Sequence, residues 1–378
     1  MTTVVGLGAT RLARGLNEGA LDGIGTYTQA LLSHLPLVSD LKYRPVVWRE
    51  RSLPSELMSG MYLPKMRMEY DLLASAFTGR RSFNDNEIAE QFSLFHATDH
   101  FIPKLCKTPV IATLMDPVAL MYPEWVRQRG RKFKNWLFRK EVTWAEHYIT
   151  ISHFVVDDLV KYFSINREDI TVIPLGVDDI YFQKPAAGVE AITLEKYGLN
   201  PGFFLFIGTI QPRKNLKILL DAFSLLPVDI QKKHSLVVAG RLGWGCGEEV
   251  QILQELTKKG VAKWLDYVST EEKRVLLSTA LGLVFPSLYE GFGLPVLEAF
   301  ASGLPVIGSN TTALAEVIGD AGIQVNPLNV NELCSAMCLL ANEPALALDL
   351  SEKGLVKAYS HTWRLTSTKT AEVYKKFM

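Results

Sequence analysis

The sequence is poor in cysteine and contains no long apolar run, and each shortage excludes a class of protein. Its four cysteines are Cys106, Cys246, Cys334 and Cys338, and their spacing fits neither a zinc site nor the disulfide framework of a small secreted domain. No run of about 18 apolar residues occurs, so we expect no membrane-spanning helix. The first residues, Met-Thr-Thr-Val-Val, lack the basic and apolar regions of a signal peptide. These absences predict a cytoplasmic protein.

The chain also lacks an excess of either charge, since 40 Lys and Arg residues balance 40 Asp and Glu residues. Without a basic surplus there is no overall field that would attract nucleic acid, and we expect no nucleic-acid partner. A length of 378 residues is enough for two domains, each with its own core.

Short apolar runs alternate with helical patterns along the first half of the chain. This alternation predicts an α/β fold with a doubly wound parallel sheet, in which ligands bind beyond the carboxyl ends of the strands. Residues that follow strands are therefore the first candidates for a site. The predicted strands are 2–6, 43–48, 94–96, 110–114, 148–151 and 171–173, and the predicted helices are 25–35, 132–146 and 153–163.

Residues 286–303 carry the clearest pattern for a binding site. A short apolar run leads through a Gly-rich turn into a predicted helix that spans 295–302, and the first N–H groups of such a helix are free to bind an anion. Glu290 on the turn and Glu298 inside the helix offer acceptors for sugar or ribose hydroxyls. The alternative is an ordinary strand–turn–helix with two solvated carboxylates. The turn comprises Glu290, Gly291, Phe292, Gly293 and Leu294.

A second candidate site follows the predicted strand 203–207. The segment Gly208-Thr-Ile-Gln-Pro-Arg-Lys-Asn215 leads from this strand into a predicted helix. Its adjacent cations, Arg213 and Lys214, suit a diphosphate, because arginine offers a planar set of donors and lysine a point charge. An exposed basic helix cap is the structural alternative.

Three loops of the first half carry weaker patterns. The segment from Asp22 to Gly25 precedes a helix, and Gly23 and Gly25 would let a phosphate or an acceptor come close, although a plain turn is equally compatible. The segment His96-Ala-Thr-Asp-His100 is predicted as a polar loop at a strand end, where a histidine orients a sugar or is merely hydrogen-bonded. Residues 6–11 hint at a dinucleotide fingerprint but lack its third glycine.

The residues around Glu290 resemble a known family. Glu290 and Glu298, with seven residues between them, match the E-x7-E motif of retaining GT-B glycosyltransferases, and PSLYEGFGLPVLEAFASGLPVI is similar to family 4 well beyond the two glutamates. The segment GTIQPRKN resembles the donor-phosphate loop of that family. The resemblance implies two Rossmann-like domains facing a cleft: an acceptor-binding domain at 1–180, with a C-terminal helix at 361–378 packing back on it, and a donor-binding domain at 190–360.

The resemblance also implies roles for single residues. Arg213 and Lys214 would neutralise the leaving nucleoside diphosphate, Glu290 would hold sugar hydroxyls, and Glu298 the ribose. Asp116 resembles one member of a strand-end His-Asp pair, but Met115 stands where the family usually has histidine. Asp116, backbone groups or His96 must then do more. The catalytic candidates are Glu290, Arg213, Lys214 and Asp116; the other donor-binding candidates are Glu298, Gly291, Phe292, Gly293, Leu294, Gly208, Thr209, Tyr267, Val268 and Gly25; the acceptor and sugar candidates are Gly23, His96 and His100.

Four segments, GIGTYT, FHATDH, MYPE and GTIQPRKN, look most like bacterial mannosyltransferases of O-antigen or exopolysaccharide assembly. This implies transfer of mannose from GDP-mannose to a lipid-linked or oligosaccharide acceptor, with no metal and no cofactor. A GDP-rhamnose or UDP-hexose donor is the alternative within the class. A non-catalytic subunit that binds a sugar nucleotide also stays open because of Met115, and an NAD-dependent enzyme is a third hypothesis.

Two other segments carry predictions about the surroundings of the site. Residues 127–140 hold seven cations and no acid, with Phe133 and Trp136 among them. They predict either an amphipathic helix whose apolar stripe joins the core, or a contact with an anionic inner-membrane surface or a lipid-diphosphate acceptor. Residues 59–90 show poor periodicity and predict a long mobile loop by the acceptor cleft. Residues 182–199 predict a linker into the second domain.

Overall fold

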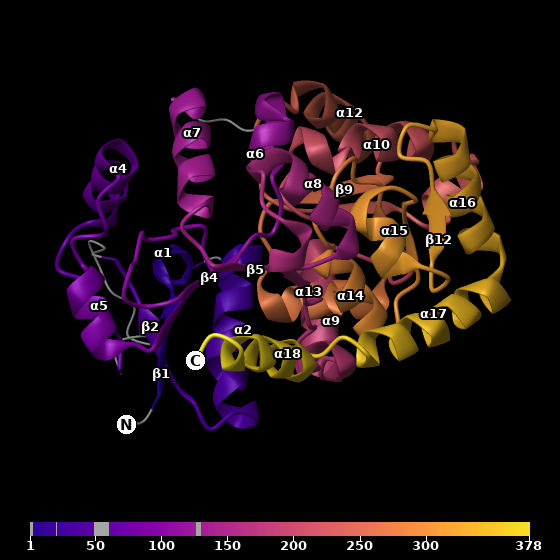
Figure 1. Cartoon of the computed structure of the whole chain (residues 1–378). Helices are drawn as coiled ribbons and strands as arrows, with labels where there is room; N and C mark the ends of the chain where they lie inside the picture. Colours follow the sequence, from indigo (N-terminus) through magenta and orange to yellow (C-terminus); the bar gives the residue numbers. More distant parts are fainter. Residues whose placement is uncertain (1–2, 20, 49–59, 126–129) are drawn as a thin grey trace. The chain divides into compact units, whose positions relative to one another are not determined.

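The computed structural model describes residues 3–19, 21–48, 60–125 and 130–378, which form two compact units. Unit 1 comprises Met1–Leu175 and Trp363–Met378, and unit 2 comprises Gly176–Thr362. Each unit is a parallel sheet with helices on both faces (Figure 1). The chain passes from unit 1 to unit 2 once and returns for its last helix.

The sheet of unit 1 has the order β2-β1-β3-β4-β5-β6, and all of its described pairings are parallel. The order reverses at β1, whose neighbours are β2 on one side and β3 on the other. The strands are β1 Val4–Gly8, β2 Lys42–Val46, β3 Leu94–Ala97, β4 Val110–Thr113, β5 His147–Thr150 and β6 Ile170–Val172. The helices are α1 Thr10–Asn17, α2 Gly23–Val38, α4 Met68–Thr78, α5 Asp85–Gln91, α6 Val118–Met121, α7 Arg131–Val142, α8 His153–Phe163 and α18 Trp363–Lys375, with 3₁₀ turns η1 Pro123–Trp125 and η2 Arg167–Asp169.

The sheet of unit 2 has the order β12-β11-β10-β7-β8-β9, and it is also parallel. Here the order reverses at β7, which lies between β10 and β8. The strands are β7 Phe204–Ile207, β8 Leu236–Ala239, β9 Ala262–Leu265, β10 Gly282–Phe285, β11 Val306–Ser309 and β12 Ile323–Val325. The helices are α9 Ala187–Tyr197, α10 Leu216–Leu225, α11 Val228–Lys233, α12 Gly247–Lys258, α13 Thr270–Thr279, α14 Leu294–Ala301, α15 Thr312–Ile318, α16 Val330–Asn342 and α17 Pro344–Tyr359, with 3₁₀ turns η3 Asp179–Phe182 and η4 Pro212–Lys214.

The central strands of both sheets are continuous apolar runs because helices cover both of their faces. All four residues of β7 are buried, as are those of β8 and β10. Polar residues mark where helices begin: Ser152 caps α8, and Ser269 with Glu272 forms the predicted capping box of α13. These local patterns are why most of the predicted strands and helices are confirmed to within a few residues.

Two predictions about the chain between these elements are wrong. The described part of 59–90 is not a loop but contains α4 and α5, and 182–199 contains α9. On α4 the pattern is inverted, since Asp71 and Ser75 are buried while Tyr70 and Phe77 are exposed. Within α9 only Thr193 is buried. Neither helix therefore shows the apolar stripe that reveals a helix in a sequence.

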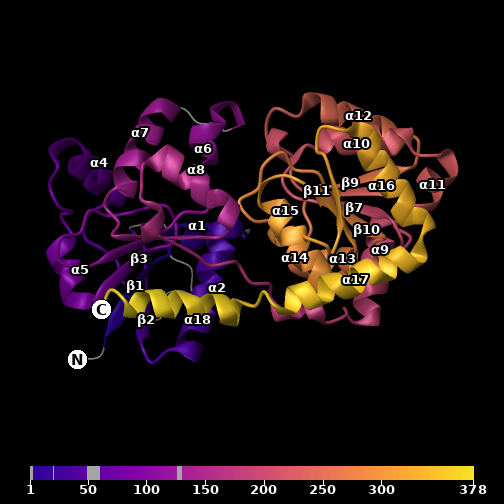
Figure 2. The ribbon, with the colours of Figure 1, turned by 45° about the vertical axis from the view of Figure 1, so that its right-hand side comes forward.

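The last helix, α18, packs on unit 1 as predicted. It runs alongside α2, with Trp363 and Tyr27 at a ring-centroid distance of 6.3 Å (Figure 2). The Tyr374 hydroxyl lies 2.6 Å from Nδ1 of His96 in β3, and both residues are fully buried. Thr366 donates a hydrogen bond to the carbonyl of Pro174 at 2.8 Å. Residues from the two ends of the chain thus share one core.

In the part of the chain that the structure describes, no single helix is long and apolar enough to cross a membrane. The pair α16 and α17, bent by 100° at the break between them, passes that test together by length and composition.

The crossing of the β7 and β8 exits predicts one sensitive glycine. A Cβ atom at Gly240 would lie 1.9 Å from the carbonyl oxygen of Gly208, so the backbone would have to move. We expect Gly240→Ala to lower the free energy of unfolding by about 3 kcal/mol or more, measured by urea denaturation. The matched control is Gly247→Ala at the start of α12, where no heavy atom lies within 4 Å of the added carbon. A Gly240→Ala midpoint equal to that of the control would contradict the tight crossing.

Candidate functional site

The order reversal at β7 decides where the site of unit 2 lies. Because β7 and β10 are parallel neighbours, the segments that follow them leave the same edge of the sheet side by side. The first of these segments holds Arg213 and Lys214, and the second holds Glu290. A crevice beyond the carboxyl ends of strands, at the point where strand order reverses, is where open α/β sheets bind ligands.

Arg213, Lys214 and Glu290 form one ion cluster at this point. The Lys214 ammonium lies 2.6 Å from Oε1 of Glu290, and the Arg213 guanidinium lies 2.9 Å from the same oxygen. Lys214 is almost fully buried, with its ammonium 4.5 Å from the ring centroid of Phe285, while Arg213 keeps about a quarter of its side chain exposed. The prediction that these residues belong to one site is consistent with this geometry, because two cations share one carboxylate.

The charge state of Glu290 follows from these neighbours. Burial by itself would raise the pKa of this carboxyl, but the charges of Arg213 and Lys214 and their hydrogen bonds lower it to about 2. Glu290 is therefore ionised at neutral pH. The cluster holds two positive charges and one negative charge, so it keeps one positive charge for an anionic ligand.

Backbone conformation holds the two segments in this arrangement. Asn215, with a φ of 56°, donates through Nδ2 to the carbonyls of Pro286 at 3.0 Å and Pro327 at 2.7 Å. The N–H of Leu288 donates to the carbonyl of Arg213 at 2.8 Å. The two strand-end segments are thus one hydrogen-bonded frame, and the cations cannot move far from Glu290 without breaking it.

The Gly-rich turn places the start of α14 beside this frame. Gly293 has a φ of 114°, and a Cβ atom there would lie 2.6 Å from Leu314, so glycine is required on both counts. Gly291 and Phe292 are buried, and α14 begins at Leu294. The first N–H groups of α14 therefore follow directly after Glu290, as the sequence predicted.

Glu298 has a different set of partners. Its Oε1 lies 2.7 Å from the ammonium of Lys273 on α13, and that ammonium lies 5.0 Å from the ring centroid of Tyr181. Burial and the neighbouring Glu298 carboxylate raise the pKa of the Tyr181 hydroxyl, so this hydroxyl stays protonated as a donor. Sequence reasoning missed Lys273 and Tyr181, because neither belongs to a motif or follows a strand.

The other donor-binding candidates of unit 2 lie at the same edge of the sheet. Gly208 and the exposed Thr209 follow β7, and Tyr267 and Val268 follow β9. The Tyr267 ring is half exposed, and the Arg241 guanidinium lies 4.8 Å from its centroid. Arg241, which follows β8, was not a candidate from the sequence. An exposed aromatic face beside a cation suits the stacking of a planar base.

In unit 1 the corresponding reversal lies between β1 and β3, and a side chain of the protein occupies it. Oδ2 of Asp99 accepts the N–H groups of Thr10 at 2.8 Å and Arg11 at 3.2 Å, at the start of α1. Burial raises the pKa of Asp99 to about 6, although these N–H donors act against the rise. A dinucleotide pyrophosphate would need the same N–H groups. The arrangement therefore disfavours the NAD hypothesis.

The prediction that His96 lies on a strand-end loop is wrong. His96 is the third residue of β3 and is fully buried, with Nε2 2.7 Å from the Thr113 hydroxyl and Nδ1 2.6 Å from the Tyr374 hydroxyl. Burial lowers the pKa of its imidazole to about 3, so the ring is neutral. Both ring nitrogens serve the core of unit 1. This burial argues against the contact with a sugar that the sequence predicted.

His100 and Asp116 do follow strands. His100 has a φ of 65°, stacks on Phe138 at 5.2 Å, and has a buried Nε2 with no hydrogen-bond partner among the described residues. Oδ1 of Asp116 accepts the N–H of Val118 at 3.0 Å, and Met115 beside it is buried. Their predicted roles in the reaction stay predictions.

The glycines before α2 differ in their surroundings. Asp22 caps the helix by accepting the N–H of Gly25 at 2.8 Å, and it pairs with Arg11 at 3.3 Å. A Cβ at Gly25 would lie 3.2 Å from Leu21, whereas one at Gly23 would meet nothing within 4 Å. Space alone therefore requires glycine at neither position as strictly as at Gly293.

Two other features of the described chain bear on the site. No group of three or more His, Cys, Asp or Glu side chains is arranged to hold a metal ion within residues 3–19, 21–48, 60–125 and 130–378. A cavity of about 590 Å³ does not include the ion cluster. That cavity is lined by Lys196, Tyr197, Leu253, Gln254, Thr257, Lys258, Lys263, Trp264 and Leu265. Lys196 is paired with Glu272, and Lys263 donates to a carbonyl of Tyr197, so little of its charge is free for a ligand.

Comparison with known proteins gives matches over both units. A family model described as Glycosyltransferase Family 4 matches residues 22–180, and one described as Glycosyl transferases group 1 matches residues 194–355. The chain is 30% identical over 283 residues to the O-antigen chain mannosyltransferase B of Escherichia coli, which covers 75% of this chain and 74% of that one.

Solved structures give the fold. Sucrose-phosphate synthase from Thermosynechococcus elongatus superposes with a TM-score of 0.73 at 18% identity, covering 99% of this chain and 98% of that chain. The Anabaena protein HepE, solved with UDP and glucose, superposes with a TM-score of 0.72 at 15% identity over the full length of both chains. The predicted GT-B fold is confirmed.

The ion cluster predicts a pH-dependent contribution to stability. The pKa of Glu290 is about 2 when folded against 4.5 for an ordinary glutamate, so its ionised form stabilises the fold above about pH 4.5 and this contribution is lost as the pH falls toward 2. Glu290→Gln should therefore cost about 3 kcal/mol at pH 7, and its difference from wild type should shrink as the pH falls below 4.5.

The measurement is urea unfolding of both proteins across that pH range. Glu255→Gln, at an exposed position of α12, is the matched control and should change little at any pH. A constant difference between Glu290→Gln and wild type from pH 7 to pH 3 would sink the assignment of an ionised, paired Glu290.

Proposed function

We propose a specific reaction for this chain, which belongs to the family 4 glycosyltransferases: transfer of mannose from GDP-mannose to a lipid-linked or oligosaccharide acceptor, with retention of anomeric configuration. The observation that carries the proposal is the ion cluster of Arg213, Lys214 and Glu290 at the order reversal of the unit 2 sheet. It joins fixed cations, a sugar-hydroxyl acceptor and a helix start in one place.

In the proposed reaction the donor diphosphate lies against Arg213, Lys214 and the first N–H groups of α14. The bond between the sugar C1 and the diphosphate oxygen breaks, and its electron pair stays on the phosphate. The acceptor hydroxyl oxygen forms the new bond to C1 on the same face, and its proton passes to the departing phosphate oxygen. The two cations stabilise the charge that grows on the phosphate, where a preorganised site lowers the barrier most.

The proposed exchange of partners explains why Glu290 is paired in the unliganded protein. Arg213 and Lys214 would share their charge between the incoming phosphates and Glu290, which leaves lone pairs of Glu290 for sugar hydroxyls. Glu298, oriented by Lys273, would accept from the ribose hydroxyls. Tyr267 and Val268 would contact the base.

The identity of the donor is the finer part of the proposal. The similarity to an O-antigen mannosyltransferase over three quarters of the chain supports GDP-mannose. The structural similarity to a protein solved with UDP and glucose keeps a UDP-hexose as the alternative donor, and GDP-rhamnose is the other. A non-catalytic binding subunit is the alternative from another class, and a single turnover of any donor would remove it.

We also propose that the reaction needs neither a metal ion nor a cofactor, because Arg213 and Lys214 supply the positive charge that a metal would bring to the diphosphate. A lipid-linked acceptor would place the enzyme at the inner face of the cytoplasmic membrane. The predicted contact through residues 127–140 is part of this proposal; residues 126–129 lie outside the described chain.

The proposed roles predict the effect of one substitution. Arg213→Gln leaves the Lys214–Glu290 pair intact, so the variant should fold, yet its kcat should fall roughly 100- to 1000-fold because one phosphate donor is lost. The assay is transfer of labelled sugar from GDP-mannose, UDP-glucose and GDP-rhamnose in parallel. Lys217→Gln is the matched control, since Lys217 pairs with Asp221 and Glu248 instead. Equal rates for Arg213→Gln and Lys217→Gln would contradict the phosphate role.

Metal removal gives a separate outcome. Prolonged dialysis against EDTA should leave the rate of transfer unchanged, because the charge on the leaving diphosphate is met by fixed side chains. The rate is measured before and after dialysis, and again after Mg²⁺ or Mn²⁺ is restored. Loss of activity on dialysis that Mn²⁺ restores would overturn metal independence while leaving the transfer reaction in place.

A further inference from the structure

Helices α4 and α7 of unit 1 stand side by side and expose a cluster of aromatic rings (Figure 1). Phe77 on α4 is 68% exposed and Phe133 on α7 is 45% exposed. Their ring centroids lie 6.2 Å apart, and both rings contact Trp136 of α7, at 5.2 Å and 5.7 Å. Three large rings that contact one another in solvent keep much apolar area in water, which folding alone does not favour.

Cations surround these rings. Lys132, Arg139 and Lys140 are exposed and lie one helical turn from Trp136, so they flank the aromatic cluster on the same side of α7. Arg80 follows α4, and its guanidinium lies 5.2 Å from the ring of the exposed Phe83. The one acid of α7, Glu141, is buried. We call the surface formed by Phe77, Phe133, Trp136, Lys132, Arg139 and Lys140 the α4–α7 face.

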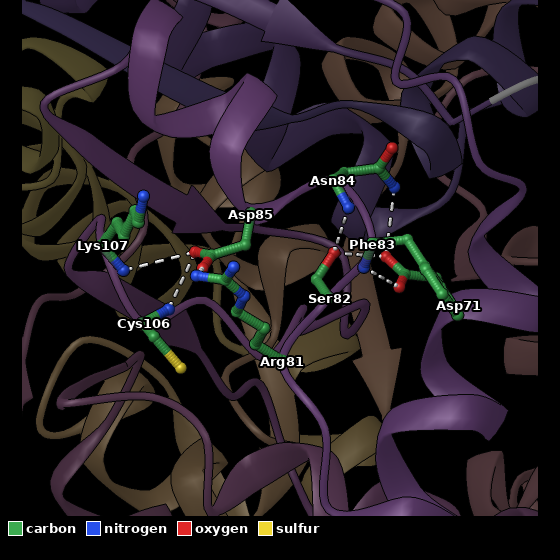
Figure 3. Close-up of polar contacts among 8 residues, drawn as sticks. All are labelled: Asp71, Arg81, Ser82, Phe83, Asn84, Asp85, Cys106 and Lys107. Atoms are coloured by element: carbon green, nitrogen blue, oxygen red, sulfur yellow. Dashed lines mark hydrogen bonds and ion pairs between the residues drawn. The ribbon is translucent and has the colours of Figure 1, made fainter.

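The exposure of Phe77 belongs to a fixed helix and not to a loose loop. Buried Asp71 on α4 accepts hydrogen bonds from Ser82 Oγ at 2.5 Å, Phe83 N–H at 2.8 Å and Asn84 Nδ2 at 3.1 Å (Figure 3). In the same view Asp85 accepts the N–H groups of Cys106 and Lys107 at 2.9 Å and 3.2 Å. These buried carboxylates anchor α4 to the rest of unit 1. Holding an apolar ring in water on an anchored helix indicates a partner for it.

The opposite side of α7 contacts the segment that follows β3. Phe138 stacks on His100, with 5.2 Å between the rings and 25° between their planes. Glu141 accepts a backbone hydrogen bond from Ile102. One helix therefore joins the exposed α4–α7 face to the strand-end segment 98–102, which includes a histidine predicted to serve the acceptor.

The chemistry of the face selects its partner. Aromatic rings flanked by Lys and Arg stems match the boundary between lipid headgroups and acyl chains, where rings insert and cations meet anionic phosphates. A second copy of the chain would present the same positive charges to itself. A nucleic acid would leave three rings without an apolar partner unless its bases were unstacked.

We propose that the α4–α7 face docks unit 1 on an anionic lipid bilayer and thereby brings segment 98–102 to the level of an acceptor carried on a lipid. The docking half of this inference rests on the face alone; the acceptor half rests on the proposed function. The occupant is the bilayer surface itself, bound through headgroup phosphates and shallow insertion of Phe77, Phe133 and Trp136. Segment 59–90, predicted as a loop, thus contributes half of the docking face.

The test is sedimentation of the full chain with vesicles, without donor or acceptor. We expect binding to vesicles with about one third phosphatidylglycerol and little to pure phosphatidylcholine, and loss of binding between 0.1 M and 1 M NaCl, as the Debye length falls from about 10 Å to about 3 Å. Replacing Lys132, Arg139 and Lys140 together by Gln should weaken binding roughly 100-fold, at roughly fivefold per cation. The double variant F77S/F133S should also lose binding at low salt.

Matched controls use exposed residues of unit 2. Replacing Lys232, Lys258 and Lys259 by Gln, or Leu348 and Val356 by Ser, removes equal charge or a similar number of exposed apolar side chains elsewhere, and should leave binding unchanged. Equal binding to both kinds of vesicle, equal loss in the controls, or protein self-association that F77S/F133S abolishes would each overturn docking.

The same variants separate this inference from the proposed function. On a short water-soluble acceptor F77S/F133S should keep the wild-type rate, whereas on a lipid-linked acceptor in anionic vesicles its rate should fall with its binding. Wild type that docks but transfers no sugar contradicts the proposed function and leaves docking intact. Wild type that transfers to the lipid-linked acceptor without docking contradicts only the inference drawn from the α4–α7 face.

Discussion

The pairing of β10 with β7 is the interaction on which the candidate site depends. The two strands are far apart in the sequence but hydrogen-bonded in the sheet, and because they are parallel the chain leaves both at one edge. Only this pairing brings Arg213 and Lys214 to Glu290. Apart from one another, a buried lysine and a buried glutamate would each carry a desolvation cost that nothing offsets. Sheet order, ion pairing and the charge state of Glu290 are thus one fact seen at three levels.

The two units use the same topology for opposite purposes. In unit 2 the reversal point holds mobile charge, since the cations of the cluster can share their partner with a phosphate. In unit 1 the backbone donors at the reversal are already bound to Asp99, which ties β3 to the start of α1. A carboxylate built into the chain turns a potential anion site into a structural joint. The binding chemistry of unit 1 must therefore come from the segments around that joint, such as 98–102.

Local patterns in the sequence predicted what local physics controls. Apolar runs, the capping box at Ser269 and the Gly-rich turn before α14 each follow from a few neighbouring residues, and each is present in the structure. Helix α4 escaped because its buried face carries Asp71, whose partners come from the chain after the helix. No periodicity can report a polar side chain that is satisfied at a distance.

The candidate site was predictable to the same extent. Arg213, Lys214 and Glu290 lie in motifs, whereas Lys273 is recognisable only by its distance from Glu298. His96 shows the reverse case: its position after an apolar run looked exposed, but Thr113 and Tyr374 take both ring nitrogens. Tyr374 belongs to the last helix, so nothing near His96 in the sequence announces it.

That helix sets an order of events during synthesis. Unit 1 contains the first residues to leave the ribosome, yet its core closes over His96 only when α18 has been made. Unit 2 lies entirely within the intervening chain and can complete its own sheet earlier. The segment that is translated first is therefore the one that finishes last, and until then the uncovered side of α2 is a natural place for a chaperone to bind.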